Sequence, residues 1–233
     1  MTIFYVVATP IGNLEDITLR ALRVLKEVDV ILCEDTRVTK RLLEKYEIVG
    51  KQLVAYNEQK SGIAIEKIVE LLEEGRNLAL VSDAGTPGIS DPGSYLVQKI
   101  RQALPEVKIE SVPGPSALTT ALSIAGIPVS DFVFLGFLPH KKGRETLFKE
   151  IAVSERAMVF YESPHRILKT LESLHQHLLS RAALDNRESK IVIARELTKI
   201  HEEVLNGTAS ELLEFFKNNE EKVRGEFVVV VTP

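Results

Sequence analysis

The residues with the clearest chemical content lie in one loop, Ser82 to Gly93, which reads SDAGTPGISDPG. Its three glycines and two prolines predict an unusual backbone path on which main-chain groups can approach a ligand closely. The loop contains no Lys or Arg, so it lacks the lysine of a phosphate-binding loop, and its charges are Asp83 and Asp91. Carboxylates and carbonyls favour a ligand that offers hydroxyl or amino donors and carries positive charge, such as a nucleoside sulfonium.

Two further polar segments follow apolar runs. Glu34 to Arg37 follows the run at 30–33, and Ala8 to Asn13 follows the first run of the chain. The latter has one glycine where a dinucleotide-binding fingerprint needs three, which disfavours nicotinamide or flavin binding. If the runs are parallel strands, these two segments and the loop at 82–93 meet at the carboxyl edge of one sheet, where ligands bind.

Simpler structural roles are open for the same acidic residues. Asp91 could be the N-cap of the next helix, with Pro92 as its first residue. Asp35 or Thr36 could likewise cap the helix that follows the second apolar run.

The elements that position these loops follow from hydrophobic periodicity. In the first half, apolar runs alternate with helical patterns, which predicts strands at 3–8, 30–33, 53–55, 78–81 and 107–112 and helices at 18–27, 36–46, 63–73 and 95–103. Continuous apolar strands favour a parallel sheet covered on both faces. The second half predicts strands at 132–137, 158–161, 191–194 and 227–231, a possible strand at 201–206, and helices at 118–125, 144–151, 165–179 and 209–217.

A rigid break, Pro113 to Ala117, separates the two halves. We therefore predict an α/β protein of two domains, residues 1–113 and 114–233, with a mainly parallel sheet in the first and a mixed sheet in the second.

Composition narrows the class of protein. Of the 233 residues, 45% are hydrophobic and 27% charged, and no apolar run approaches the roughly 20 residues of a membrane span. The N-terminus lacks a signal-peptide pattern, so we expect a cytoplasmic protein without a membrane partner. Cys33 is the single cysteine, which excludes an intrachain disulfide and a cysteine-based zinc site, and no metal site is predicted.

The net charge of −4 disfavours nonspecific coating of nucleic acid, so any RNA contact must come from local basic patches. The loop from His140 to Arg144 has no acidic residue, and a second patch lies early in the helix at 36–46. A run of charges is often only solvated surface, yet in an acidic chain a concentrated basic loop is a candidate for binding phosphates. The predicted RNA contacts are Arg37, Lys40, Arg41, Lys141, Lys142 and Arg144.

Six motifs, in order over residues 3 to 231, resemble the tetrapyrrole methylase superfamily: Thr9 to Thr18, Glu34 to Arg37, Ser82 to Gly93, Pro113 to Ala117, Phe160 to Arg166 and Ala194 to Lys199. Within it the chain is similar to the bacterial branch that methylates the ribose 2′-oxygen of a cytidine in the decoding region of 16S ribosomal RNA. The resemblance implies S-adenosylmethionine in a cleft between two α/β domains, a homodimer, and the small ribosomal subunit as partner.

Motif matching also implies a set of cofactor contacts: Pro10, Ala84, Gly85, Thr86, Ile89, Ser116 and Ala117 in the first half, and Tyr161, Glu162, Glu196 and Leu197 in the second. Where porphyrin-precursor enzymes carry Gly-Asp-Pro, this chain has Gly85-Thr86-Pro87. Asp83 is therefore expected to supply the carboxylate, and the departure points away from a tetrapyrrole substrate.

Methyl transfer to a ribose hydroxyl needs positioning and a base for the hydroxyl proton. The candidates are Glu34, Asp35, Glu196 and Lys199, of which the pair Glu34 and Asp35 is favoured by its place at the sheet edge. An ordinary carboxylate is a weak base for an alcohol, so a raised pKa or a late proton transfer is required. Two alternatives stay open: methylation of a small heterocycle, and a noncatalytic module that binds RNA or a nucleotide.

Overall fold

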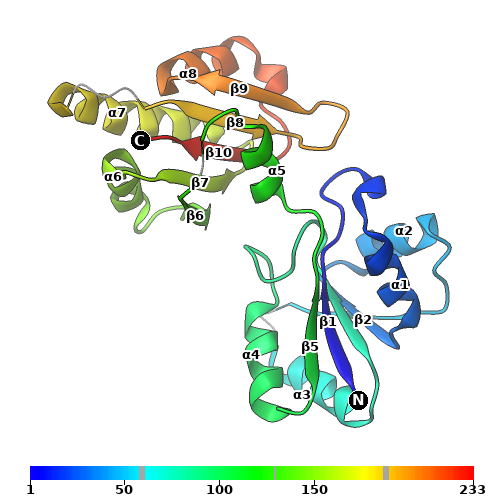
Figure 1. The fold of residues 1–233 in the computed structure, drawn as a ribbon. Coiled ribbons are helices and arrows are strands. Elements are labelled where there is room, and N and C mark those ends of the chain that lie inside the picture. The colour runs from blue at the N-terminus through cyan, green and yellow to red at the C-terminus, as the bar shows by residue number, and fades with distance from the viewer. Residues whose placement is uncertain (58–60, 129, 186–188) are drawn as a thin grey trace. The chain divides into compact units, whose positions relative to one another are not determined.

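The computed structural model describes residues 1–57, 61–128, 130–185 and 189–233. The chain divides into two compact units, Met1–Ser116 and Ala117–Pro233, and within the described residues each unit contains one five-stranded sheet (Figure 1). The division lies three residues after the predicted boundary, in the same Pro-Gly-Pro-Ser segment. The predicted α/β class, with one parallel and one mixed sheet, is confirmed. Among the described helices, none is long and apolar enough to cross a membrane.

The sheet of the first unit is parallel throughout, in the order β3-β2-β4-β1-β5. Its strands are β1 (Ile3–Val7), β2 (Val30–Cys33), β3 (Gln52–Ala55), β4 (Leu78–Val81) and β5 (Lys108–Val112). Every residue of β2 and β4 is buried, as expected for central parallel strands covered on both faces.

Helices cover both faces of this sheet. The helices α1 (Leu19–Glu27) and α2 (Thr36–Lys45) pack on one face, and α3 (Ser61–Glu73) and α4 (Ser94–Ala103) on the other (Figure 1). A short 3₁₀ turn, η1 (Leu14–Asp16), precedes α1. Strands β1 and β4 are neighbours, but the helices that follow them lie on opposite faces. Such a switch point opens a crevice at the carboxyl ends of the two strands, where ligands bind.

The first residues of α2 and α4 show which of the two candidate aspartates is an N-cap. Asp35 is the N-cap of α2, since its Oδ1 accepts the N–H of Arg37 at 2.8 Å. The hypothesis that Asp91 caps α4 is wrong, because α4 begins at Ser94 with Gly93 as its N-cap. Gly93 has a φ of 143°, and a Cβ there would lie 2.8 Å from Leu80 Cδ2. Glycine is therefore required where the loop enters α4.

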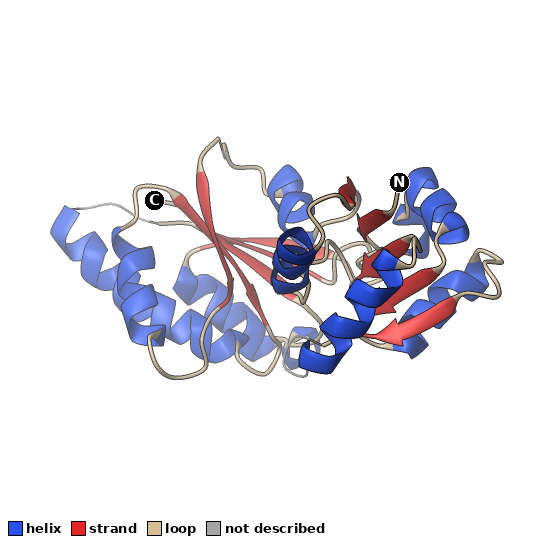
Figure 2. Ribbon diagram, turned by 90° about the horizontal axis from the view of Figure 1, so that it is seen from below, coloured by secondary structure: helices blue, strands red, loops and turns tan. Residues whose placement is uncertain are grey.

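The sheet of the second unit has the order β6-β7-β10-β8-β9 (Figure 1). In Figure 2 most helices of this unit, which contains the C-terminus, lie along one side of its strands. Its strands are β6 (Phe132–Phe137), β7 (Ala157–Glu162), β8 (Ile191–Arg195), β9 (Glu203–Gly207) and β10 (Phe227–Val231). Among the described pairings of this second sheet, only the β6–β7 pair is parallel. The open question of a strand at 201–206 is answered by β9.

The described helical elements of this unit are α5 (Ala117–Ile124), α6 (Arg144–Val153), α7 (Ile167–Asp185), α8 (Ala209–Asn218) and the 3₁₀ turn η3 (Glu220–Lys222). Phe148, Leu171 and Phe216, from α6, α7 and α8, join one core with the sheet.

A buried ionic cluster lies at the end of β7. The side chain of Glu162 is fully buried, and its Oε1 lies 2.7 Å from Arg166 Nε and accepts the N–H of Ser163 at 2.8 Å. Its Oε2 accepts the hydroxyl of Thr170 at 2.6 Å and lies 3.4 Å from Arg144 Nη2. The carboxylate is therefore surrounded by donors from its own protein.

The same arginines hold the start of the loop that follows β6. Arg166 donates to the carbonyl of Leu138 at 2.8 Å, and Arg144 donates to that of Pro139 at 3.2 Å. Arg144 is only 7% exposed. Its predicted contact with RNA phosphates is therefore corrected, because its guanidinium is buried against Glu162 and Thr170.

Candidate functional site

The loops at the carboxyl edge of the first sheet are joined by hydrogen bonds. Thr9 and Gly85 exchange two backbone bonds, with Thr9 N–H to Gly85 O at 2.9 Å and Gly85 N–H to Thr9 O at 3.1 Å. The hydroxyl of Thr9 donates to the carbonyl of Ser82 at 2.9 Å. The loop after β2 joins them, because Asp35 N–H donates to Asp83 Oδ1 at 3.1 Å. The predicted meeting of the three loops is confirmed.

A fourth loop, after β5, lies against the glycine loop. The hydroxyl of Thr86 donates to the carbonyl of Pro115 at 3.2 Å. Gly85 has a φ of 84°, and a Cβ there would lie 3.5 Å from Ile11 Cγ2 and 3.9 Å from Pro115 O. The backbone at Gly85 is thus held in a conformation that favours glycine, between the loops after β1 and β5.

The predicted cofactor contacts of the first unit gather around this junction. Pro10 and Gly85 are buried, Ala84, Thr86 and Ser116 are half-buried, and Ile89 is 46% exposed. Ala117 is half-buried and begins α5 of the second unit.

Glu34 carries an unusual carboxylate. Its Oε1 is buried and has no hydrogen-bonding partner within the described parts of the chain. Burial, followed by the nearby negative charges of Asp91 and Asp83, raises the pKa of Glu34 to about 7, although the backbone N–H of Asp83 opposes this shift. Glu34 can therefore hold or release a proton near neutral pH.

Its neighbour Asp35 has the opposite character. The side chain of Arg37 donates to Asp35, with Nη2 2.6 Å from Oδ2, and the capped backbone N–H of Arg37 adds a further bond. These hydrogen bonds lower the pKa of Asp35 to about 2. At neutral pH Asp35 is an ionised cap that binds protons weakly.

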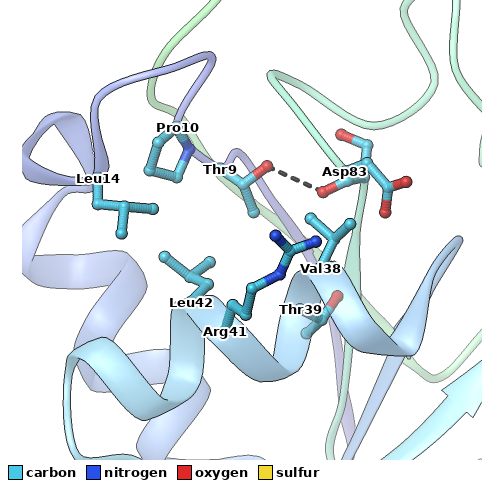
Figure 3. A pocket seen from close by; sticks show the side chains of 9 residues that line it. Thr9, Pro10, Leu14, Val38, Thr39, Arg41, Leu42 and Asp83 are labelled. Carbon is cyan, nitrogen blue, oxygen red and sulfur yellow. Dashed lines mark hydrogen bonds between the residues drawn. The ribbon is translucent and has the colours of Figure 1, made fainter.

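A pocket of about 250 Å³ opens beside Asp83, whose carboxylate accepts the backbone N–H of Asp35. Its lining comes from the loop after β1, from α2 and from the end of β4: Thr9, Pro10, Leu14, Val38, Thr39, Arg41, Leu42, Ser82 and Asp83 (Figure 3). Pro10 and Leu14 lie opposite Leu42, and the side chain of Arg41 rises from α2 toward Thr9 and Val38 (Figure 3). The pocket is thus a mainly apolar space with charged groups at its margin.

Most of this lining is not predicted from the sequence. Leu14, Val38, Thr39 and Leu42 were not predicted as functional residues, since the apolar positions of α2 are equally typical of a helix packed on a sheet. Thr9 and Leu14 lie within the motif from Thr9 to Thr18, and Ser82 begins the motif from Ser82 to Gly93, and this membership was the available signal.

The predicted contacts of the second unit lie at one end of its sheet. Phe227 pairs with both Glu162 and Arg195, so the ends of β7 and β8 flank the start of β10. Tyr161 is half-buried and packs its ring edge-on against Phe134 and Phe137, with centroids 5.0 and 5.4 Å apart. Leu197 is buried, as is Glu162, whose carboxylate is held by the arginine cluster and is not free for a ligand. The cofactor contact implied for Glu162 stays a prediction, and its side-chain carboxylate is occupied within the protein.

Glu196 and Lys199, the other candidate bases, form an ion pair of 2.8 Å, and Lys199 also pairs with Glu226 at 3.1 Å. Burial works to raise the pKa of Glu196, but the bond to Lys199, its charge, the backbone N–H of Glu226 and the charge of Arg195 together outweigh it, and the pKa lies below its ordinary value. Burial works to lower the pKa of Lys199, but its two carboxylate partners raise it. Both shifts disfavour these residues as bases.

The remaining predicted RNA contacts are exposed. Lys141 and Lys142 lie in the loop before α6, and Arg37, Lys40 and Arg41 lie on α2. Arg37 pairs with Asp35, and Lys40 with Glu44 at 3.6 Å. Exposed ion pairs of this kind are weak, so the two cations can exchange partners with a phosphate at small cost.

Known proteins resemble this chain in sequence and in fold. Proteins named ribosomal RNA small subunit methyltransferase I are similar to the chain: that of Thermotoga maritima is 48% identical over 97% of this chain and 96% of its own length. The protein of that name from a Hydrogenobaculum species is 46% identical over 98% of this chain and 94% of its own length. A crystal structure of uroporphyrin-III-C-methyltransferase from Thermus thermophilus has the same fold, with a TM-score of 0.67 at 22% identity over 100% of this chain and 94% of that one.

The family described as tetrapyrrole (corrin/porphyrin) methylases matches residues 4–213. Its members are S-adenosylmethionine-dependent methyltransferases. The family model covers most of the chain, and the Thermotoga maritima relative matches nearly its full length. The parallel sheet and the glycine loop joined to Thr9 are consistent with this match. The chain belongs to the tetrapyrrole methylase family.

Proposed function

We propose that this protein transfers the methyl group of S-adenosylmethionine to the ribose 2′-hydroxyl of a cytidine in the decoding region of 16S ribosomal RNA. The names of relatives at 46–48% identity support the small-subunit RNA as substrate. The observation that carries the choice of a ribose hydroxyl is the carboxylate of Glu34, whose pKa of about 7 suits the removal of an alcohol proton. The predicted homodimer is part of this proposal.

The loops at the carboxyl edge of the first sheet fit the cofactor. The loop from Ser82 to Gly93 has no cation to repel a sulfonium, and Gly85, at a φ of 84°, holds this loop against the loops after β1 and β5. We assign the contacts to Pro10, Ala84 to Thr86, Ile89 and Ser116, with Ala117, Tyr161, Glu196 and Leu197 as contacts from the second unit. When bound, S-adenosylmethionine supplies an electrophilic methyl group.

Within this assignment the two acidic neighbours have separate roles. Glu34 accepts the proton of the ribose hydroxyl as that oxygen is methylated, because its buried Oε1 lacks a partner and its pKa is raised. Asp35 holds the start of α2 and orients Arg37. Of the two residues favoured by the sequence, we therefore propose Glu34 as the base and Asp35 as a positioning residue.

The proposal is tested by incubating the protein with S-adenosylmethionine and small ribosomal subunits from cells that lack it. Mass spectrometry of the nuclease-digested RNA should show one added methyl group on a cytidine ribose. Naked 16S RNA and a panel of small heterocycles are run in parallel. Methylation of a heterocycle alone would support the alternative enzyme class, and absence of any transfer would support a binding module.

The cofactor loop can be tested with a matched pair of glycine variants. Gly85→Ala and Gly50→Ala both place a side chain at a positive φ, 84° and 73°, so both carry strain of about 1–3 kcal/mol. Only Gly85 adjoins the loops after β1 and β5, whereas a Cβ at Gly50 meets nothing within 4 Å. We expect calorimetry to show weaker binding of S-adenosylhomocysteine for Gly85→Ala alone. Equal affinities for the two variants would remove the loop from the cofactor site.

The pH dependence of the rate tests Glu34. A base must be deprotonated, so kcat/KM should rise with pH to a plateau above pH 7, following the pKa of about 7. Glu34→Gln should abolish this rise and most of the activity, whereas Asp35→Asn should keep the rise. Because ionisation of Glu34 is disfavoured in the folded protein, stability should fall as pH rises from the ordinary pKa of 4.5 to about 7, and Glu34→Gln should remove that fall. An unchanged pH profile in Glu34→Gln would assign the base elsewhere.

The basic loop is tested by the salt dependence of RNA binding. If Lys141 and Lys142 contact phosphates, replacing both with Ala should flatten the log–log slope by about 1.4–1.8, without changing cofactor affinity. Lys67→Ala with Lys149→Ala removes the same charge from other exposed positions and should leave the slope unchanged. Equal slopes for the two double variants would shift the assignment to Arg37, Lys40 and Arg41.

A further inference from the structure

We propose that the pocket between the loop after β1 and helix α2 binds the base of the target nucleotide, and that the base is a pyrimidine with an amino group. This inference rests on the proposed function and adds to it a binding site for one part of the substrate. The pocket lies entirely within the first unit, and its lining residues are named above.

The size and walls of the pocket fit a single flat ring. Its volume of about 250 Å³ lies below the roughly 300–1,000 Å³ of sites for drug-sized ligands, so it suits a fragment and not a whole nucleoside cofactor. Pro10 and Leu14 lie opposite the α2 residues, which contribute Val38 and Leu42 (Figure 3). Enzymes that act on an extruded nucleotide hold its base between apolar side chains in this way.

The charged groups of the pocket suit the edge of such a base. Asp83 only accepts hydrogen bonds, and Arg41 only donates them. Carboxylates accept from the N4 amino group of cytosine, while a guanidinium can donate to its O2 or N3 acceptors. The lining of the pocket therefore offers an acceptor and a donor, which are the partners that an aminopyrimidine edge needs.

Both side chains are held in place by the backbone. Asp83 Oδ1 accepts the N–H of Asp35 at 3.1 Å, and Arg41 Nε donates to the carbonyl of Arg37 at 3.4 Å. Each group keeps further capacity, since a carboxylate oxygen has two lone pairs and a guanidinium has five N–H groups.

Asp83 connects the pocket to the proposed base catalyst, Glu34. The backbone N–H of Asp83 is hydrogen-bonded to the carboxylate of Glu34, so one residue links the pocket margin to the proton acceptor. The ribose of a nucleotide whose base fills the pocket is joined to that base by a single glycosidic bond, so it lies next to the pocket. Binding the base here would thus bring the sugar hydroxyls toward Glu34, which the proposed reaction requires.

Filling the pocket tests its occupancy. Val38→Phe adds a ring to the wall contributed by α2, whereas Leu19→Phe adds bulk at a fully solvated position of α1, where Leu19 is 87% exposed. We expect Val38→Phe to lower kcat/KM for small subunits at least tenfold with unchanged affinity for S-adenosylhomocysteine, and Leu19→Phe to change neither. Full activity of a folded Val38→Phe would overturn the proposal, and so would a selective loss of cofactor affinity, because the pocket would then belong to the cofactor.

Substitution at the margin tests the identity of the base. Asp83→Asn keeps an oxygen for the N–H of Asp35 but adds amide donors. Substrates that carry cytidine or uridine at the target position are compared with each enzyme. The preference of the wild type for cytidine should fall roughly tenfold in Asp83→Asn, with unchanged binding of S-adenosylhomocysteine. Weaker binding of S-adenosylhomocysteine with an unchanged preference would return Asp83 to the cofactor contact that the motifs imply, and would overturn its assignment to the base. An unaltered preference would overturn the assignment of Asp83, whereas a wild-type protein that methylates neither RNA would overturn the proposed function itself.

Discussion

The parallel pairing of β1 with β4 is the constraint on which the site depends. Because the helices after these two strands lie on opposite faces of the sheet, their loops diverge and leave a crevice at the carboxyl edge. The two backbone bonds between Thr9 and Gly85 then fix one loop against the other. Gly85 can make this contact because its φ of 84° costs a glycine nothing. The pocket, the glycine loop and the acidic residues all take their positions from this junction.

Two adjacent carboxylates at this edge show how surroundings set chemistry. Glu34 and Asp35 follow the same strand and have similar ordinary pKa values, yet their pKa values in the fold are about 7 and about 2. Burial beside Asp83 and Asp91 disfavours the charge on Glu34, whereas hydrogen bonds from Arg37 stabilise the charge on Asp35. Glu34 can therefore exchange a proton near neutral pH, whereas its neighbour Asp35 stays ionised and caps α2.

The second unit contains a buried carboxylate that, unlike that of Glu34, is fully hydrogen-bonded. The buried carboxylate of Glu162 is surrounded by Arg144, Arg166 and the hydroxyl of Thr170. Removing one partner of such a cluster typically costs about 3–5 kcal/mol, because the remaining charge is left buried and unpaired. The two arginines also fix the carbonyls of Leu138 and Pro139. The loop that carries the exposed lysines therefore begins from a rigid base.

The sequence by itself determined the class of fold and the order of its elements, because hydrophobic periodicity and glycine and proline placement are local properties. It located the helices to within a few residues, apart from the longer C-terminal end of α7, and it identified the family motifs. Tertiary structure alone decided which basic side chains are exposed and can reach a ligand. Arg144 and Lys142 look alike in sequence, but one is buried against Glu162 and the other is exposed. Likewise, Val38 became a pocket wall only when α2 packed beside the loop after β1, because a pocket belongs to the space between elements and not to any one of them.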